Sequence, residues 1–339
     1  MRAALAEAAK GKGLTAPNPA VGAVIMRRGR IIARGHHRKA GGPHAEIEAL
    51  RALAHPGLAR GATLIVTLEP CSTRGRTPAC TDAIREAGIS RVVYGATDPN
   101  PAHAGRARRI LEADGVAVCT GVLEEECRAL NCAWNTWIST GMPFVTAKAG
   151  MSLDGRISSH PRRRWITCRE ARADAMRLRA ESDAILVGAR TLRDDDPRLT
   201  VRGIPGARNP LRVIWSRSGD LPPMAKVFTD GGETRVFSGV TLRSVLKQLA
   251  RDGIQSVLIE GGGHTLGRAL DARLVHRIVF YVAPSLIGGP VPAVAGRGFP
   301  TPHSSIQTGS ITARLVGETL RMEAWVVPPP SCHHAKSQP

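Results

Sequence analysis

The chain has 339 residues, which at roughly 150 residues per domain predicts two domains, each able to bury its own core. Hydrophobic residues make up 42% of the chain, a globular composition that excludes a fibrous or largely disordered protein. The formal charge of +19 comes from basic residues scattered along the whole chain with little aromatic interleaving, so we expect phosphorylated small molecules as partners and no nucleic acid.

Membrane and export signals are missing from the sequence. No apolar run approaches the roughly 20 residues that a membrane span requires, so no membrane contact is expected. Residues 1–14 carry an early acidic side chain and predict a short helix ending at a glycine, not a signal peptide. These two observations favour the cytoplasm.

The seven cysteines do not suggest a disulfide scaffold. Cys71 and Cys80 belong to a dense motif of potential metal ligands. The other five show no common ligand spacing, and we expect most of them to be buried thiols, because free cysteine packs as a small hydrophobic residue. They are Cys119, Cys127, Cys132, Cys168 and Cys332.

The first 141 residues alternate between strand and helix patterns, which favours an α/β domain with a sheet covered by helices. Residues 20–25 and 30–34 predict a hairpin around the turn Arg27-Arg28-Gly29. The remaining expected elements are a helix at 44–53, a strand at 62–68, a helix at 80–87, a strand at 91–95, a helix at 104–113, a strand at 116–119 and one long helix at 123–138.

Gly141-Met142-Pro143 interrupts this rhythm and predicts a domain boundary, with a second domain over residues 142–327. A helix is expected after Thr167, where Glu170 completes a capping box. The other expected elements are strands at 144–149, 184–187, 211–215, 256–260, 276–283 and 320–327, and helices at 242–251 and 264–270. Residues 328–339 predict a disordered tail.

One histidine and two cysteines form a motif with metal chemistry. His44 opens a helix that carries Glu46 two residues later, Cys71 follows a strand, and Cys80 opens the next helix. Zinc nucleobase deaminases use such a His-Cys-Cys set with a nearby glutamate, although here eight residues separate the two cysteines. Three protein ligands leave the fourth tetrahedral position for water. We therefore predict Zn²⁺ on His44, Cys71 and Cys80, with Glu46 as the catalytic proton carrier.

The helix N-terminus at Cys80 is expected to favour a thiolate on that residue. A structural zinc site with four protein ligands is the alternative to a catalytic one. Of the other side chains, His36 and His37 lie close enough in sequence to be considered as the fourth ligand.

Several motifs around these ligands resemble the deaminase of the riboflavin pathway. They are APNPAVG at 16–22, GHH at 35–37, GPHAE at 42–46, TLEPCS at 67–72, GRTPAC at 75–80 and DPNP at 98–101. The resemblance implies a cytidine-deaminase-like, three-layer domain in which Asn18 and His37 contact the substrate and Arg76 contacts its ribose phosphate. This sequence departs from the family at Thr73, where a histidine is usual.

The second half resembles the reductase domain of the same bifunctional family over nearly its whole length. The matching stretches are 147–156, 165–167, 178–180, 183–188, 191, 195–202 and 259–263. The resemblance implies a fold related to dihydrofolate reductase and NADPH as cofactor. Independently of it, a strand that runs into Gly261-Gly262-Gly263 and then a helix suits phosphate binding by backbone N–H groups.

The resemblance also implies individual contacts in this domain. The cofactor would contact Gly150, Trp165, Thr191, Asp195, Ser216, Gly262, Gly263, His264, Thr265, Leu266 and Gly267. The substrate would contact Arg179, Leu199, Arg202 and Glu260, and the two arginines suit a ribose phosphate. Two positions depart from the family: Arg163 stands where a serine contact falls, and Trp215 replaces the usual acid before Ser216.

The implied function is hydrolytic deamination of 2,5-diamino-6-ribosylamino-4(3H)-pyrimidinone 5′-phosphate, followed by NADPH-dependent reduction of its ribosyl group to a ribityl chain. The expected partners are this phosphorylated aminopyrimidine and further copies of the chain in a homo-oligomer. A tRNA or nucleoside deaminase with an accessory domain is the alternative, but it predicts a short C-x-x-C. An RNA-binding protein with a vestigial deaminase fold would have lost Glu46 or a ligand, and all are present.

Overall fold

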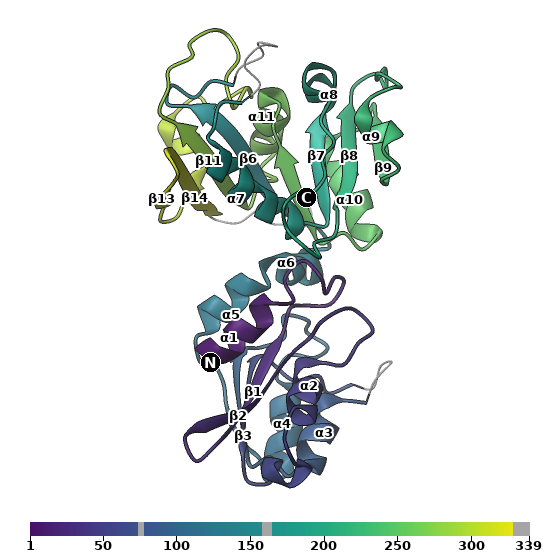
Figure 1. The fold of residues 1–339 in the computed structure, drawn as a ribbon, viewed down its shortest axis with the longest axis vertical. Coiled ribbons are helices and arrows are strands. Elements are labelled where there is room, and N and C mark those ends of the chain that lie inside the picture. The colour runs from purple at the N-terminus through teal and green to yellow at the C-terminus, as the bar shows by residue number, and fades with distance from the viewer. Residues whose placement is uncertain (74–77, 158–164, 328–339) are drawn as a thin grey trace, which may run out of the picture. The chain divides into compact units, whose positions relative to one another are not determined.

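Figure 1 shows the computed structural model of the chain, which describes residues 1–73, 78–157 and 165–327. The chain divides into two compact units, Met1–Ser139 and Thr140–Pro339, so the division lies close to the predicted boundary at residue 141. Residues 328–339, predicted to be a disordered tail, lie outside the described residues. Among the residues that are described, no helix has the length and apolar character to cross a membrane.

The first unit is built on a five-stranded sheet of order β2-β1-β3-β4-β5. Strand β1 pairs antiparallel with β2 and β3, whereas β3, β4 and β5 run parallel. Helices α1 and α5 contact one another, and α2, α3 and α4 contact in series; Figure 1 shows the two groups on opposite faces of the sheet. The predicted three-layer arrangement is therefore confirmed.

The elements of this unit are α1 (Arg2–Ala9), β1 (Gly22–Arg27), β2 (Arg30–His36), α2 (Ala45–Arg51), β3 (Thr63–Leu68), α3 (Cys80–Glu86), β4 (Arg91–Ala96), α4 (Arg106–Ala113), β5 (Ala117–Cys119), α5 (Glu124–Leu130) and α6 (Cys132–Thr140). The predicted hairpin is confirmed. Arg28 and Gly29 have φ angles of 50° and 76°, the pair of left-handed residues that a two-residue hairpin turn requires.

The single long helix predicted over 123–138 is wrong. Helix α5 ends at Leu130 and α6 begins at Cys132, and Asn131 between them has left the helical conformation, with a φ of −107° and a ψ of 26°. The side chain of Asn131 bonds to the backbone of Ala20, and this tertiary contact accompanies the break.

The second unit is built on a nine-stranded sheet, counted over the described residues, of order β12-β14-β11-β6-β10-β7-β8-β9, with β13 pairing on β14. The strands from β11 to β9 along this order run parallel to one another. Strand β14 pairs antiparallel with β11, β12 and β13. Parallel strands expose their carboxyl ends at one edge, where ligands of α/β proteins bind. That edge carries the second site.

The elements of this unit are β6 (Phe144–Ser152), α7 (Arg169–Ala180), β7 (Ala184–Gly188), α8 (Ala189–Asp195), β8 (Leu211–Ser216), α9 (Lys226–Thr229), β9 (Thr234–Ser238), α10 (Leu242–Arg251), β10 (Ser256–Glu260), α11 (Gly263–Asp271), β11 (Arg277–Ala283), β12 (Gln307–Thr308), β13 (Thr312–Val316) and β14 (Thr319–Val327). Every strand and helix predicted here is present. The sequence did not reveal α8, α9, β9, β12 and β13, which are short or lie at the sheet margins with few buried side chains.

The predicted capping box of α7 is wrong. The helix begins at Arg169 with Cys168 as its N-cap, so Glu170 occupies N2 and not the N3 position that a capping box requires. The start is fixed by tertiary contact, because Cys168 N donates to Thr319 Oγ1 at 3.2 Å and Cys168 Sγ lies 3.1 Å from the carbonyl oxygen of Val316.

The cysteines outside the metal motif occupy different environments. Cys127 is buried as expected, and Cys132 and Cys168 are half-buried. Cys119 is exposed, because this residue ends the edge strand β5. Only one of these four described thiols is buried, so the expectation that most of the five are buried is wrong. Cys332 lies outside the described residues.

Candidate active sites

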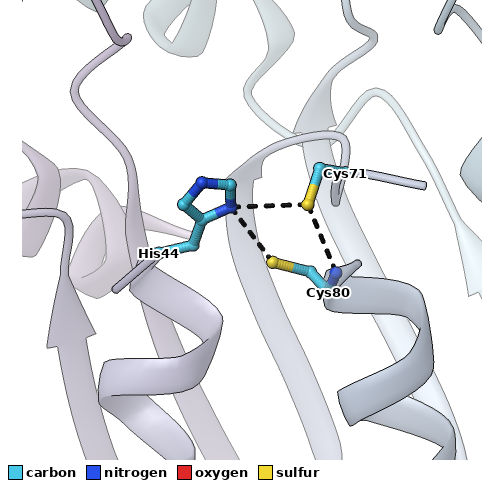
Figure 2. A group of neighbouring side chains, drawn as sticks. All are labelled: His44, Cys71 and Cys80. Atoms are coloured by element: carbon cyan, nitrogen blue, oxygen red, sulfur yellow. Dashed lines mark hydrogen bonds between the residues drawn. The ribbon is translucent and has the colours of Figure 1, made fainter. Parts of the chain in front are cut away.

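The three predicted zinc ligands converge in the first unit. Their ligand atoms all lie within 4.8 Å of one another, and the described residues contain no other such group of three histidine, cysteine or acidic side chains. Figure 2 shows His44 Nδ1 directed at both sulfurs, 3.2 Å from Cys80 Sγ and 3.4 Å from Cys71 Sγ. His44 is the N-cap of α2, Cys71 follows β3, and Cys80 is the first residue of α3. One imidazole nitrogen and two sulfurs at this spacing fit a zinc ion.

The expectation that the helix N-terminus favours a thiolate on Cys80 is wrong for the metal-free protein, because the lowered pKa belongs to Cys71. The backbone N–H of Cys80, at the start of α3, donates to Cys71 Sγ at 3.2 Å (Figure 2). A hydrogen bond from the Cys80 thiol, together with His44, lowers the pKa of Cys71 to about 4, whereas the Cys71 thiolate raises the pKa of Cys80. The helix N-terminus therefore stabilises a thiolate on Cys71 in the metal-free protein.

Glu46 lies beside this cluster on α2 and is buried, with 3% of its surface exposed. Burial, and secondarily the charge of Cys71, raise the pKa of Glu46 to about 7. A carboxyl group with a pKa near neutrality can both accept and return a proton. This is the property that the sequence required of the catalytic residue.

Neither His36 nor His37 is a fourth ligand. His37 Nδ1 lies 2.8 Å from the carbonyl oxygen of Pro43, so this nitrogen carries the proton and donates. Its Nε2 then accepts from Asn18 Nδ2 at 3.0 Å. His36 lies instead beside Glu7, with Nδ1 3.5 Å from a carboxylate oxygen.

The His37 ring meets the His44 ring edge-on, with centroids 5.7 Å apart. Burial lowers the pKa of His37, which keeps its imidazole neutral. The structure thus brings Asn18 and His37 together beside a metal ligand. Arg76 lies outside the described residues, so its contact with a ribose phosphate stays a prediction.

Glu69, in the motif before Cys71, has a role that the sequence did not reveal. Its buried carboxylate accepts the backbone N–H groups of Asp98, Gly105 and Ala107 at 3.2, 3.0 and 3.0 Å. It therefore fastens the loop between β4 and α4. No local pattern could have revealed this, because its partners lie 29 to 38 residues away.

A groove of about 1280 Å³ lies at the carboxyl edge of the second sheet. Residues after β7, β8 and β10 line it, together with part of the 290–297 segment. The predicted cofactor contacts that line it are Thr191, Asp195, Ser216, Gly262, Gly263, His264 and Thr265. A Cβ atom on Gly263 would lie 2.2 Å from the carbonyl oxygen of Pro292, so the backbone packs there as only glycine allows.

The other predicted cofactor contacts lie outside the groove lining. Leu266 is buried in the core, and a Cβ on Gly267 would lie 2.2 Å from Gly296 N, so both contribute to the packing beneath the groove and not to its lining. Trp165 is 59% exposed, and the Arg172 guanidinium lies over its ring, 4.7 Å from the ring centroid. Gly150 lies on β6 against Thr167.

Two of the predicted substrate contacts bind each other. Arg179 Nε and Nη2 donate to the two carboxylate oxygens of Glu260 at 2.8 and 2.7 Å, and Nη1 donates to the Thr200 carbonyl oxygen at 2.8 Å. Burial opposes ionisation, but the charges of Arg179 and Lys148 hold the pKa of Glu260 at about 2. The guanidinium group of Arg179 therefore already binds a carboxylate with the two N–H groups that would otherwise face a ribose phosphate.

Lys148, with Nζ 3.8 Å from Glu260, completes this charged group and was not singled out from the sequence. A lysine inside the apolar pattern of residues 144–149 was the available signal.

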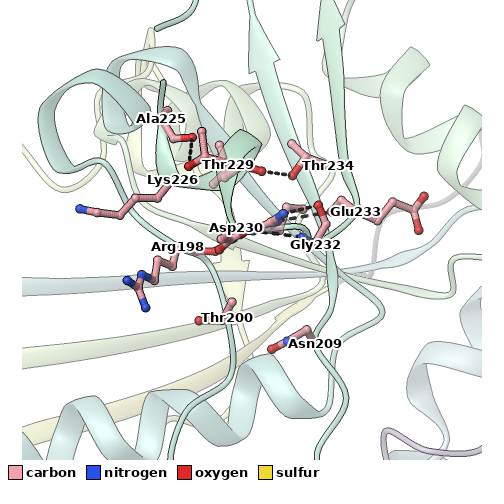
Figure 3. A network of polar contacts seen from close by, with 12 residues as sticks. Arg198, Thr200, Asn209, Ala225, Lys226, Thr229, Asp230, Gly232, Glu233 and Thr234 are labelled. Atoms are coloured by element: carbon pink, nitrogen blue, oxygen red, sulfur yellow. Dashed lines mark hydrogen bonds and ion pairs between the residues drawn. The ribbon is translucent and has the colours of Figure 1, made fainter. Parts of the chain in front are cut away.

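The remaining two predicted contacts lie on one loop. Leu199 has a φ of 54° and a buried side chain, whereas Arg202 is exposed with Nη1 3.1 Å from Thr200 Oγ1. Figure 3 shows Arg198, Thr200 and Asn209 among the polar residues around this loop. Asn209 Oδ1 accepts from Val201 N at 2.8 Å.

A buried arginine also contacts the backbone of this loop. The side chain of Arg212 is ion-paired with Asp230, and it donates to the carbonyl oxygens of Gly232 and, at 3.4 Å, of Arg198. Contacts from Arg179, Asn209 and Arg212 together thus set the conformation of this loop.

Known proteins resemble both units. A family model for the cytidine and deoxycytidylate deaminase zinc-binding region matches residues 1–96, and one for the RibD C-terminal domain matches residues 143–317. The riboflavin biosynthesis protein RibD of Mycobacterium tuberculosis is 43% identical over 91% of each chain. That of Aquifex aeolicus is 38% identical over 94% of this chain and 96% of the relative.

A solved structure shows the same similarity in three dimensions. It is a diaminohydroxyphosphoribosylaminopyrimidine deaminase/5-amino-6-(5-phosphoribosylamino)uracil reductase from Thermotoga maritima, 35% identical to this chain. The superposition has a TM-score of 0.87 and covers 96% of this chain and 97% of the other.

Proposed function

Because the chain belongs to the RibD family of riboflavin-biosynthesis deaminases and reductases, we propose that its two units act in succession on one phosphorylated pyrimidine. The first unit would hydrolyse the exocyclic amine of 2,5-diamino-6-ribosylamino-4(3H)-pyrimidinone 5′-phosphate. The second would reduce the ribosyl group of the product to a ribityl chain with NADPH. Family membership decides against the tRNA- or nucleoside-deaminase alternative.

The cluster of His44, Cys71 and Cys80 with buried Glu46 beside it carries the proposal for the first step. These three ligands would hold zinc, which when bound supplies a Lewis acid that activates water. Glu46 would take the proton from water and return it to the departing amine, as its pKa of about 7 allows.

The Asn18–His37 pair is proposed to orient the pyrimidine. His37 is fixed by Pro43 and Asn18, so the Asn18 amide is held in one orientation with its oxygen available to accept from the substrate. A neutral His37 adds no charge beside the metal ligands. Arg76 is the proposed contact of the ribose phosphate in this unit.

The glycine turn after β10 supports the proposal of a dinucleotide in the second unit. Gly261 and Gly262 have φ angles of 77° and 70°, and α11 begins at Gly263, so the first backbone N–H groups of this helix are placed for a pyrophosphate. The cofactor supplies the hydride, and the protein orients it against the sugar.

Arginines around the groove support NADPH over NADH. Arg190, Arg217, Arg243 and Arg268 all line it. Arg190 pairs with Asp194 at 3.3 Å and Arg243 donates to the Ala272 carbonyl oxygen, whereas neither Arg217 nor Arg268 forms an ion pair with a described residue. Arg217 directly follows Ser216 at the end of β8, and we assign the 2′-phosphate of NADPH to it.

The substrate of the second step is assigned to the Glu260 and Arg202 side of this unit. Arg179 and Lys148 fix Glu260 as a carboxylate that can accept from sugar hydroxyls. Arg202 is exposed and suits the ribose phosphate. Leu199, with its side chain buried, would contribute through its backbone.

Separate assays of the two half-reactions test this function. The purified protein is given the diaminopyrimidinone phosphate with and without NADPH, and ammonia release and NADPH oxidation are followed independently. Ammonia release without NADPH, and NADPH oxidation only after deamination, are expected. Glu46→Gln should lower ammonia release by about 10²- to 10⁴-fold and leave NADPH oxidation intact when deaminated product is supplied. Wild-type ammonia release by this variant would refute the assigned role of Glu46.

Two further expectations stay predictions. The thiolate ligands and NADPH chemistry suit a reducing compartment, which favours the cytoplasm. A homo-oligomer would be seen by light scattering of the purified protein as a mass that is a multiple of 36.1 kDa.

A further inference from the structure

Asn131, at the break between α5 and α6, binds the backbone of a residue 111 positions earlier. Its Oδ1 accepts from Ala20 N at 2.8 Å, and its Nδ2 donates to the Ala20 carbonyl oxygen at 2.9 Å. Both residues are buried, with 6% and 5% of their surfaces exposed. One side-chain amide thus satisfies both backbone groups of Ala20, much as a neighbouring β-strand would.

Ala20 lies in the loop that carries Asn18, between α1 and β1. The loop is held at its start by Asn18 N, which donates to the Thr15 carbonyl oxygen at 2.8 Å. At its end, His37 N donates to the Val21 carbonyl oxygen at 2.9 Å. Between these points, Asn131 provides the side-chain bonds that fix the backbone two residues from Asn18.

We propose that Asn131 is a positioning residue for the deamination step. By binding the backbone of Ala20, Asn131 fixes the orientation of the Asn18 side chain against His37. This orientation in turn fixes the position of the pyrimidine relative to the zinc ligands. This inference rests on the proposed function, in which Asn18 binds the substrate.

The physical reason lies in the cost of unpaired backbone groups. Without the Asn131 amide, the N–H and C=O of Ala20 would be buried and unsatisfied, so the loop would shift to reach water or another partner. A displacement of about 1 Å at a substrate contact is enough to reduce the rate strongly. The metal ligands lie at the N-cap of α2, at the first residue of α3 and after β3, and the bonds that join them to one another do not involve this loop.

The test compares Asn131→Ala with the matched control Asn135→Ala. Asn135 lies on α6, and its half-buried side chain donates to the Arg128 carbonyl oxygen at 3.0 Å. We expect Asn131→Ala to lower kcat/KM for deamination about tenfold, with zinc content and NADPH oxidation of supplied deaminated product unchanged. Asn135→Ala should retain wild-type values. A wild-type kcat/KM for Asn131→Ala would overturn the inference.

A double-mutant cycle with Asn18→Ala separates this inference from the function beneath it. If Asn131 acts through Asn18, the double variant is no slower than Asn18→Ala alone. Losses that multiply would overturn the positioning role. Wild-type deamination by Asn18→Ala would instead refute the assignment of Asn18 to the substrate.

Loss of zinc from Asn131→Ala would call for a milder change. Asn131→Asp keeps the size of the side chain and the acceptor for Ala20 N–H, but loses the donor to the Ala20 carbonyl oxygen. Reduced kcat/KM with full zinc content in this variant supports the proposal. A wild-type kcat/KM, or loss of zinc here too, shows that Asn131 only supports the fold.

Discussion

The two sites of this molecule are built in different ways. The first consists of three side chains from the ends of neighbouring elements, with donor atoms within 4.8 Å of one another. The second is a groove lined by residues from several loops, with glycines where the backbone packs most closely. Beside it, the charged side chains already pair with each other, as Arg179 does with Glu260. The first site should therefore depend on single side chains, and the second on keeping its backbone packed and its buried charges paired.

Removing one ligand from the first site should have the largest effect. Cys80→Ser replaces a buried sulfur of the cluster, so we expect loss of most bound zinc and a fall in ammonia release of at least 10²-fold. NADPH oxidation with supplied deaminated product should stay at the wild-type level. Metal analysis and the two separate assays measure these outcomes.

The control for this change is Cys119→Ser, at the exposed end of β5. It should keep both zinc and activity. If Cys80→Ser kept full zinc, the cluster would not be the metal site, and the contrast between the two sites would fail.

A charge change at the second site tests whether paired charges matter more than local shape. Glu260→Gln keeps the size of the side chain but leaves Arg179 buried without its carboxylate. Breaking a buried pair in this way costs about 3–5 kcal/mol, so the second unit should unfold at lower urea concentration and lose NADPH oxidation. Ammonia release should be unaffected.

Glu233→Gln is the matched control, because Glu233 pairs with Arg235 at the surface and is 66% exposed. An exposed pair contributes little, so the urea midpoint should hardly move. Equal effects of the two substitutions would show that burial of Glu260 is not what makes its charge important.

Acid should destabilise the second unit through His276. Burial lowers its pKa to about 4 from an ordinary value of 6.5, and its Nδ1 accepts from Val145 N at 3.1 Å. Protonation of Nδ1 would turn it into a hydrogen-bond donor that faces the N–H donor of Val145. The folded state thus prefers the neutral imidazole, so the stabilisation is complete above pH 6.5 and is lost as the pH falls from 6.5 through 4.

The shift corresponds to about 3 kcal/mol over that window. Urea unfolding at several pH values would measure it. His276→Asn, whose side-chain oxygen can accept from Val145 N without titrating there, should flatten the pH dependence by this amount. An unchanged pH profile in the variant would assign the acid sensitivity to other groups.

The same contrast explains what the sequence could predict. His44, Cys71 and Cys80 were identified because each stands in a short motif at the start or end of an element, so local patterns placed them together. The glycine turn after β10 was identified for the same reason. In the second unit, every predicted strand was present, because buried parallel strands are continuous apolar runs.

Pairings across long distances were not predictable. Arg179 and Glu260 were both selected as substrate contacts, but their mutual bonds join residues 81 positions apart. Asn131 was placed inside one continuous helix, because apolar residues continue at helical spacing on both sides, and its partner Ala20 lies 111 positions away. Propensity and periodicity describe near neighbours, whereas these residues owe their conformations to partners that only the folded chain supplies.

The smallest expected effect concerns the choice of cofactor. Arg217 is the groove-lining residue assigned to the 2′-phosphate that distinguishes NADPH from NADH. Arg217→Gln removes one charge-assisted contact at an exposed position, so the ratio of kcat/KM for NADPH to that for NADH should fall about tenfold, or roughly 1.4 kcal/mol. The value for NADH alone should barely change, because NADH lacks the phosphate.

The control for Arg217 is Arg251→Gln, an exposed arginine of α10 that does not line the groove. It lowers the net charge equally and so corrects for the general attraction of a protein of charge +19 for anions. If both variants lowered the ratio by the same factor, preference for NADPH would come from the field of the whole molecule. A fall confined to Arg217→Gln would show that even in a groove lined by many residues, one side chain sets the choice of ligand.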